Sequence, residues 1–249
     1  MPSLNLHARA LASALMFLTR LPLPARWQFP PEDLQSAYFP FVGMLIGGFA
    51  SLCYELASLF WPQELAILIA LAATIWATGA FHEDGFADSC DGFGGSWDKA
   101  EILRIMQDSR LGTYGCIGLL LILALKYAAL IAVPAEQMIP AFLLGHSLSR
   151  LVSISHLSDL SYVRLEGKAK PVATFLSYPQ LLAATVSIAP LWFLIPGEKL
   201  LPIAAALLVW RFWFNRYLQR WIGGYTGDCL GASQQVSETL IYLVLAASL

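Results

Sequence analysis

Long runs of apolar residues, separated by short polar segments, dominate the chain. A helix needs about 20 predominantly apolar residues to cross the hydrocarbon core of a bilayer, with a range of roughly 17–25. The pattern predicts about seven transmembrane helices, of which the shortest must tilt or thin the bilayer locally. The predicted spans are Ala37–Phe60, Leu65–Phe81, Gly112–Val133, Met138–Leu157, Val172–Ile195, Leu200–Phe214 and Gly231–Leu249.

The N-terminal segment Arg9–Leu21 is apolar too, but it is shorter than a span and carries arginine at both ends. We interpret it as an amphipathic helix at the membrane interface, ended by Pro22 and Pro24. Counting it as an eighth span would break the alternation that places the N-terminus and the long basic loops on the same side of the membrane. The interfacial interpretation keeps them on one side.

Composition supports a membrane protein. The 249 residues are 57% hydrophobic with a mean hydropathy of +0.62, and only 13% are charged. Soluble domains carry about 25% charged residues, so this chain has too few for a water-exposed surface. We predict a single all-α integral membrane domain. No basic patch with interleaved aromatic residues occurs, which argues against nucleic-acid binding.

The basic residues predict the orientation. Most of the 15 lysines and arginines precede the first span or lie in the loops after the second, fourth and sixth spans. Loops rich in lysine and arginine stay on the cytoplasmic side of a membrane. The N-terminus and these loops are therefore expected to face the cytoplasm.

The loop after the second span, between Phe81 and Leu111, is rich in acidic residues. Asp84, Asp88 and Asp91 are spaced i, i+4, i+7, so on a helix they share one face. Three such carboxylates repel one another unless a cation binds or their pKa values rise. Oxygen ligands favour a hard ion, and Mg²⁺ is the usual one beside a phosphate. We therefore predict a magnesium site in this cytoplasmic acidic loop.

Three other carboxylates are candidate ligands. Glu83 adjoins the set, Asp108 follows later in the loop, and Asp228 lies in a second polar island, Gly223–Ala232. An N-cap of the last helix is the alternative role for Asp228. A solvated loop is the better interpretation of Asp98, Lys99 and Glu101.

Four arginines are candidates for holding phosphate, because guanidinium binds phosphate in a bidentate manner. Arg104 and Arg110 lie near Asp108, in what the spacing predicts is a short helix. Arg150 lies within the fourth span, where a charged residue is a functional candidate, with snorkelling to the interface as the alternative. Arg20 could reach the same cytoplasmic side.

These residues stand in motifs that together resemble the cobalamin synthase family, also called adenosylcobinamide-GDP ribazoletransferase. The resemblance covers nearly the whole chain. Glu83 stands where the family pattern leads us to expect a hydrophobic residue. The motifs are FLTRLPLP (17–24), HEDGFADSCDG (82–92), RIMQDSRLGTYG (104–115), SLSR (147–150) and GGYTGDCLGA (223–232).

The resemblance implies a bacterial inner-membrane enzyme of vitamin B12 synthesis. It would join adenosylcobinamide-GDP to α-ribazole, or its 5′-phosphate, and release GMP. Mg²⁺ would bridge the diphosphate, and the arginines would take the remaining phosphate charge. Asp91, Asp108 or His82 would accept the proton of the attacking hydroxyl, although His82 is equally suited to a capping or interfacial role.

Two alternatives stay open. A CDP-alcohol phosphotransferase shares the start of the motif, Asp84-Gly85-Phe86-Ala87, but has arginine where this chain has Asp88, and its second half-motif is missing here. An ion transporter would be expected to have acidic residues along its spans, whereas the acidic residues of this chain gather in a loop.

The pair Gly43-x-x-x-Gly47 would allow a homo-oligomer to form through helix association.

Overall fold

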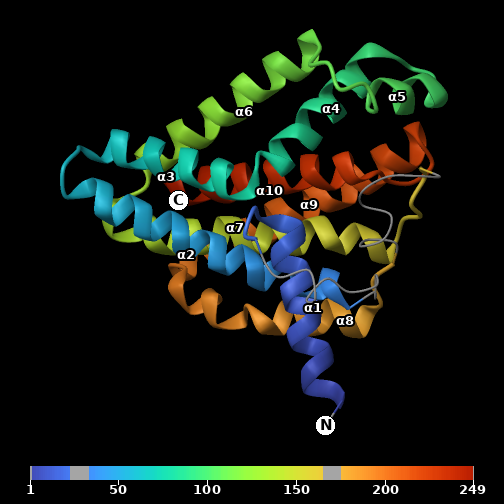
Figure 1. Cartoon of the computed structure of the whole chain (residues 1–249). Helices are drawn as coiled ribbons and strands as arrows, with labels where there is room; N and C mark the ends of the chain where they lie inside the picture. Colours follow the sequence, from blue (N-terminus) through green and yellow to red (C-terminus); the bar gives the residue numbers. More distant parts are fainter. Residues whose placement is uncertain (1, 23–33, 165–174, 249) are drawn as a thin grey trace.

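The computed structural model describes residues 2–22, 34–164 and 175–248, and this part of the chain is helical, with no strand in it. A single β-bridge joins Tyr162 to Tyr225. Figure 1 shows the order of the helices. The α-helices are α1 (Pro2–Leu18), α2 (Phe39–Ser58), α3 (Gln63–Thr78), α4 (Phe81–Gly95), α5 (Lys99–Ile105), α6 (Thr113–Ala132), α7 (Met138–Ser155), α8 (Tyr178–Ser187), α9 (Gly197–Trp221) and α10 (Gly227–Ala246).

Three helical segments are long and apolar enough to cross a membrane, namely Gln35–Ser58, Thr113–Ala132 and Ala135–Ser158. A fourth is obtained if α3 and α4, which meet at a bend of 86°, count as one broken span. The helical, membrane-embedded class is thus supported, whereas the count of seven spans is not confirmed. The cytoplasmic orientation stays a prediction.

The other predicted spans differ in specific ways. Within Val172–Ile195, α8 has only 10 residues and is followed by a 3₁₀ helix, Ala189–Leu194; residues 172–174 lie outside the described part. In place of Leu200–Phe214, α9 runs for 25 residues and carries several charges. In place of Gly231–Leu249, α10 includes buried polar side chains. Hydropathy averaged along a segment hides charged residues and helix breaks, and these distinguish the three segments from continuous apolar spans.

The bend between α3 and α4 is set by two consecutive left-handed residues. Gly79 has φ of +70° and caps α3, and Ala80 has φ of +57° immediately before α4. Glycine adopts this conformation without strain, whereas Ala80 does so at some energetic cost. The bend carries the chain from an apolar helix directly into the acidic one.

Helix α2 packs closely on α7 through glycine. A Cβ atom added at Gly47 would lie 2.6 Å from the carbonyl oxygen of Phe142, and one at Gly43 would meet the backbone of His146. Small residues let helix backbones approach each other in this way. The Gly43–Gly47 pair is therefore used inside the chain and offers no surface for a second copy.

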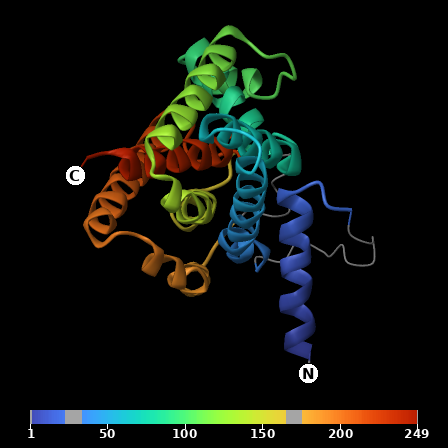
Figure 2. The same cartoon turned by 90° about the vertical axis from the view of Figure 1, so that its left-hand side faces the viewer.

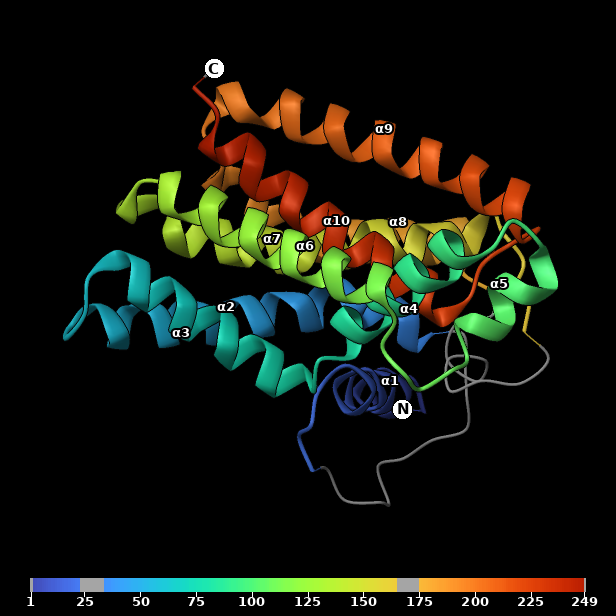
Figure 3. The ribbon, with the colours of Figure 1, turned by 90° about the horizontal axis from the view of Figure 1, so that it is seen from above.

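Helix α10 lies inside the bundle. It packs against α4, α6, α7 and α9, and Figure 3 shows it between α9 and α6. Helix α1, predicted from Arg9–Leu21, stands at one edge of the molecule (Figure 2). Its residues Ala14 and Leu18 are buried beside Phe39 and Val42 of α2.

Candidate functional site

The acidic segment is helix α4, and the expectation of a loop here is corrected. Asp84, Asp88 and Asp91 lie on successive turns, with Asp84 exposed, Asp88 half-buried and Asp91 buried. The helix sits against the start of α10, because a Cβ at Gly85 would lie 3.0 Å from the Cα of Asp228. The two polar islands of the sequence therefore meet in space, as a shared site requires.

The carboxylate of Asp88 lies within electrostatic reach of Asp228, Asp84 and Asp91. In the described part of the chain, the side chains of Asp84 and Asp88 have neither a hydrogen bond nor an ion pair. Asp228 pairs with Arg164, whose Nη2 lies 2.5 Å from its Oδ2. Burial raises the pKa of the Asp228 carboxyl, while Arg164 opposes that shift. Like charges thus face one another at the α4–α10 contact. We name the side chains of Asp84, Asp88 and Asp228 the carboxylate face.

Asp228 is not the N-cap of α10. That position belongs to Thr226, whose Oγ1 accepts the backbone N–H of Cys229 at 3.3 Å. Asp228 lies in the first turn, where a negative charge is favoured by the helix dipole. Its side chain therefore lies at the carboxylate face, where it pairs with Arg164.

Asp91 performs a structural task. Its Oδ2 accepts the N–H of Gly112 at 2.8 Å, and its Oδ1 accepts the N–H of Gly115 at 2.8 Å. These are donors at the N-terminus of α6, which has no other side-chain cap. Asp91 thereby ties the acidic helix to α6, and both of its oxygens are engaged.

The later residues of the acidic segment lie at the surface. Asp108 accepts from Arg110, with Nη2 and Oδ2 2.7 Å apart, and these bonds lower the pKa of the Asp108 carboxyl to about 2. Arg104 pairs with Glu101 across 2.6 Å on α5. Asp98, expected in a solvated loop, is the N-cap of α5 and accepts the N–H of Glu101. None of these ion pairs includes a residue of the carboxylate face.

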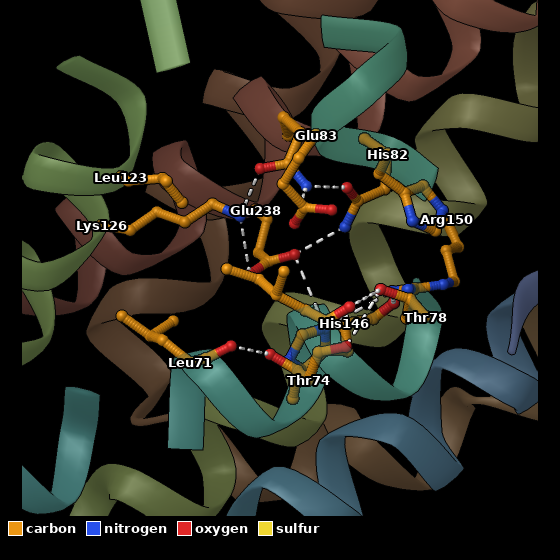
Figure 4. Close-up of a pocket in the computed structure, with 13 residues that line it drawn as sticks. Leu71, Thr74, Thr78, His82, Glu83, Leu123, Lys126, His146, Arg150 and Glu238 are labelled. Atoms are coloured by element: carbon orange, nitrogen blue, oxygen red, sulfur yellow. Dashed lines mark hydrogen bonds and ion pairs between the residues drawn. The ribbon is translucent and has the colours of Figure 1, made fainter. Parts of the chain in front are cut away.

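His82, Glu83 and Arg150 meet instead in a buried polar cavity, with Glu83 and His82 entering from α4 (Figure 4). Arg150 is 2% exposed, and its Nη1 donates to the carbonyl oxygen of His146 at 2.8 Å. The free volume, about 10 Å³, admits one water molecule and excludes a diphosphate. Arg150 is buried in the bundle and does not extend to the surface, so snorkelling does not describe it.

The same cavity contains functional candidates that the sequence reasoning missed, on α10. Glu238 forms an ion pair with Lys126 of α6 at 3.0 Å, and Gln235 and Gln234 complete the polar lining. Lys126 therefore has the buried partner that a lysine in an apolar helix requires. The sequence did contain a signal for this cluster, because Gln234, Gln235 and Glu238 are polar residues spaced i, i+1, i+4 in the last predicted span.

Arg20 lies at the bend between α3 and α4. Its backbone N–H donates to the carbonyl oxygen of Ala77 at 2.8 Å, and its side chain lies against Gly79. The residue is exposed. It is thus placed near the start of the acidic helix.

The donor set at the carboxylate face fits Mg²⁺ in chemistry, because it consists of three carboxylates, two of which have no partner in the described part of the chain. Among the described residues, no three His, Cys, Asp or Glu side chains converge closely enough to hold a metal as they stand. A bound Mg²⁺ would therefore draw part of its coordination from water or phosphate, as this ion usually does.

The fold and site define a membrane-embedded helical protein whose acidic helix packs against the start of its last helix. Residues 10–246 match the family Cobalamin-5-phosphate synthase, and the chain belongs to it. The chain is 40% identical over 240 residues to the adenosylcobinamide-GDP ribazoletransferase of Shewanella amazonensis, covering 93% of this chain and 92% of the relative. It is 42% identical over 253 residues to the protein of that name from Ralstonia pickettii, covering 99% and 98%.

No solved structure matches the chain. The family match confirms the resemblance drawn from the motifs, and it makes the chain a transferase. Its relatives' names place the family in cobalamin synthesis.

Proposed function

We propose that the protein joins adenosylcobinamide-GDP to α-ribazole, or to α-ribazole 5′-phosphate, and releases GMP. The family match over residues 10–246 carries this proposal. In the reaction, a ribose hydroxyl oxygen of ribazole forms a bond to the phosphorus next to cobinamide. The bond from that phosphorus to the GMP oxygen breaks, and the hydroxyl proton passes to a base.

Most of the work in such a transfer is positioning and neutralising charge. Asp84, Asp88 and Asp228 would hold a Mg²⁺ ion, which when bound neutralises phosphate charge and stabilises the departing GMP. Arg110 and Arg104 are exposed beside α4 and would bind phosphate oxygens. Arg164 lies at the carboxylate face and is a further cation there.

Three groups were candidates for the base, and their surroundings can be compared. Both oxygens of Asp91 already accept backbone N–H groups of α6 and so serve the fold. The bonds from Arg110 lower the pKa of the Asp108 carboxyl. His82 is buried behind the carboxylate face. None of the three is favoured by its surroundings, and Asp88, half-buried among other carboxylates, is retained as a ligand of the ion.

The orientation is part of the proposal. The carboxylate face would lie on the cytoplasmic side of the bacterial inner membrane, because the basic residues concentrate in the loops expected there. Nucleotide-bearing substrates would then reach it from the cytoplasm.

The experiment is a product assay on the purified protein in detergent or lipid. We expect GMP release from adenosylcobinamide-GDP only when α-ribazole and Mg²⁺ are both present, with loss of turnover in EDTA and recovery on adding Mg²⁺. GMP release that ignores ribazole and Mg²⁺ would contradict the proposal. CMP release from a CDP-alcohol would support the phosphotransferase alternative instead.

A further inference from the structure

Helix α4 is tied to the interior of the bundle by a chain of buried polar contacts. Gln235 donates from Nε2 to Oε1 of Glu83 at 2.9 Å, and accepts at its own Oε1 from Nζ of Lys126 at 2.7 Å. Lys126 in turn pairs with Glu238 at 3.0 Å, and both of these side chains are 3% exposed. Figure 4 shows Glu83, Lys126 and Glu238 converging on one cavity from three helices.

The charges in this cavity balance only when α4 is docked. The cations are Lys126 and Arg150, and the anions are Glu238 and Glu83, both within electrostatic reach of Arg150. Of these four groups, only Glu83 belongs to α4. Removing one partner from a buried charge set leaves an uncompensated charge, which is strongly unfavourable. When α4 packs against the bundle, Glu83 therefore supplies the second negative charge that makes this buried cluster neutral.

Glycines stand where the backbones of α4 and α10 approach most closely. A Cβ at Gly231 would lie 3.1 Å from the carbonyl oxygen of His82 and 3.3 Å from the Cα of Gly85. Gly85 in turn faces the backbone of Asp228. Small residues allow this close approach but place no side chain between the two backbones at these points. A buried polar contact between the two helices can fix the rotation of α4 against α10.

Glu83 is placed to supply it. It precedes Asp84 by one residue, which is a rotation of about 100° around the helix axis, so Glu83 points inward while Asp84 points out. Fixing Glu83 therefore fixes the direction of Asp84 and of Asp88 one turn later. The second oxygen of Glu83, Oε2, has no hydrogen-bond partner in the described part of the chain and is left for a water in the small cavity.

We propose that Glu83 is a positioning residue, and that the buried network of Glu83, Gln235, Lys126, Glu238 and Arg150 sets the rotation of α4 and so aims the carboxylate face. The inference rests on the proposed function for its catalytic consequence. It assigns Glu83 to the interior in place of the metal site considered from the sequence.

The test compares Glu83→Gln, Lys126→Met and the double variant Glu83→Gln/Lys126→Met, with Glu136→Gln as an exposed matched control. Glu83→Gln keeps an oxygen that accepts from Gln235 but removes the charge. We expect it to raise the Mg²⁺ concentration for half-maximal GMP release by roughly 10- to 100-fold, the effect typical of residues that orient metal ligands. A defect of folding alone would lower the rate without moving that concentration.

The double variant removes one anion and one cation, so it restores neutrality. It should bring the Mg²⁺ dependence back toward that of the parent protein, and Glu136→Gln should behave as the parent. If Glu83→Gln cannot be purified, recovery of expression in the double variant would show the same compensation between the two substitutions. A double variant no better than Glu83→Gln, or a Glu83→Gln variant with unchanged Mg²⁺ dependence, would overturn the proposal.

A second measurement does not depend on the reaction. Cys90 of α4 packs on Gly118 of α6, since a Cβ there would lie 2.7 Å from its sulfur, whereas Cys116 is exposed. Maleimide labelling, mapped by mass spectrometry, should modify Cys90 faster in Glu83→Gln and leave the rate at Cys116 unchanged. Unchanged labelling at Cys90 would contradict the inference. Absence of GMP release from the parent protein would instead count against the proposed function.

Discussion

The carboxylate of Asp91, on α4, accepts the backbone N–H of Gly115, in the first turn of α6, at 2.8 Å. Its other oxygen accepts the N–H of Gly112. An acidic residue is well suited to this place, because it meets unpaired donors and the positive end of the helix dipole. The acidic helix thus serves two purposes, with Asp91 supporting the fold while the side chains of Asp84 and Asp88 have no partner among the described residues.

Asp91→Asn is expected to lower stability. The amide replaces one acceptor oxygen by a donor that faces an N–H group, so one of the two capping bonds is lost. Loss of a helix cap costs about 0.5–2 kcal/mol, which corresponds to a Tm lower by roughly 1–8 °C in a protein of this size. Thermal unfolding in detergent, followed by tryptophan fluorescence, measures it. A Tm equal to that of the parent protein would show that this cap is dispensable.

Asp84→Asn and Asp88→Asn are expected to behave in the opposite way. Neither side chain has a hydrogen bond or ion pair in the described part of the chain, so the Tm should stay within about 2 °C of the parent value. Turnover should be abolished, because the variants lose negative oxygen ligands for Mg²⁺. GMP release and Tm are measured on the same preparations. Near-normal activity in both variants would remove the metal-site interpretation.

Gly85→Ala is expected to separate α4 from α10. Its Cβ would lie 3.0 Å from the Cα of Asp228, a backbone atom that cannot move aside easily. Overpacking of this kind costs about 1–3 kcal/mol, and it should also lower turnover because Asp228 shifts relative to Asp88.

Gly48→Ala is the matched control for that substitution. Nothing lies within 4 Å of a Cβ at Gly48, which is also helical, so alanine there should be neutral or slightly stabilising. Tm and GMP release report on both variants. Equal effects at the two positions would mean that the contact between α4 and α10 is looser than described.

Asp108 is expected to show no titration near neutral pH. Its bonds to Arg110 lower the carboxyl pKa to about 2, so the group is ionised above the ordinary aspartate value of about 4. What ionised Asp108 contributes is present above pH 4 and is lost only as the pH falls toward 2. Asp108→Asn should therefore lower kcat/KM by the same factor at about pH 6 and about pH 8. A factor that changes between these two pH values would make Asp108 a candidate for the titrating base.

Particular residues show where prediction from the sequence ended. The i, i+4, i+7 spacing of Asp84, Asp88 and Asp91 correctly indicated a shared helix face, because that depends only on helix geometry. It could not tell that Asp91 turns toward the N-terminus of α6, since that donor group is contributed by a distant part of the chain. Gly43 and Gly47 were correctly identified as a packing motif, but their partner proved to be α7 of the same chain.

The sequence by itself determined the helical membrane class, the acidic segment and the family, because hydrophobic runs and motifs are local properties of the chain. Only the tertiary structure decided which carboxylates face one another and which are occupied elsewhere. Asp228 meets α4 because glycines let two helices touch, and Glu83 turns inward to balance charges on α6 and α7. Such pairings depend on contacts between helices distant in sequence, and no single segment contains them.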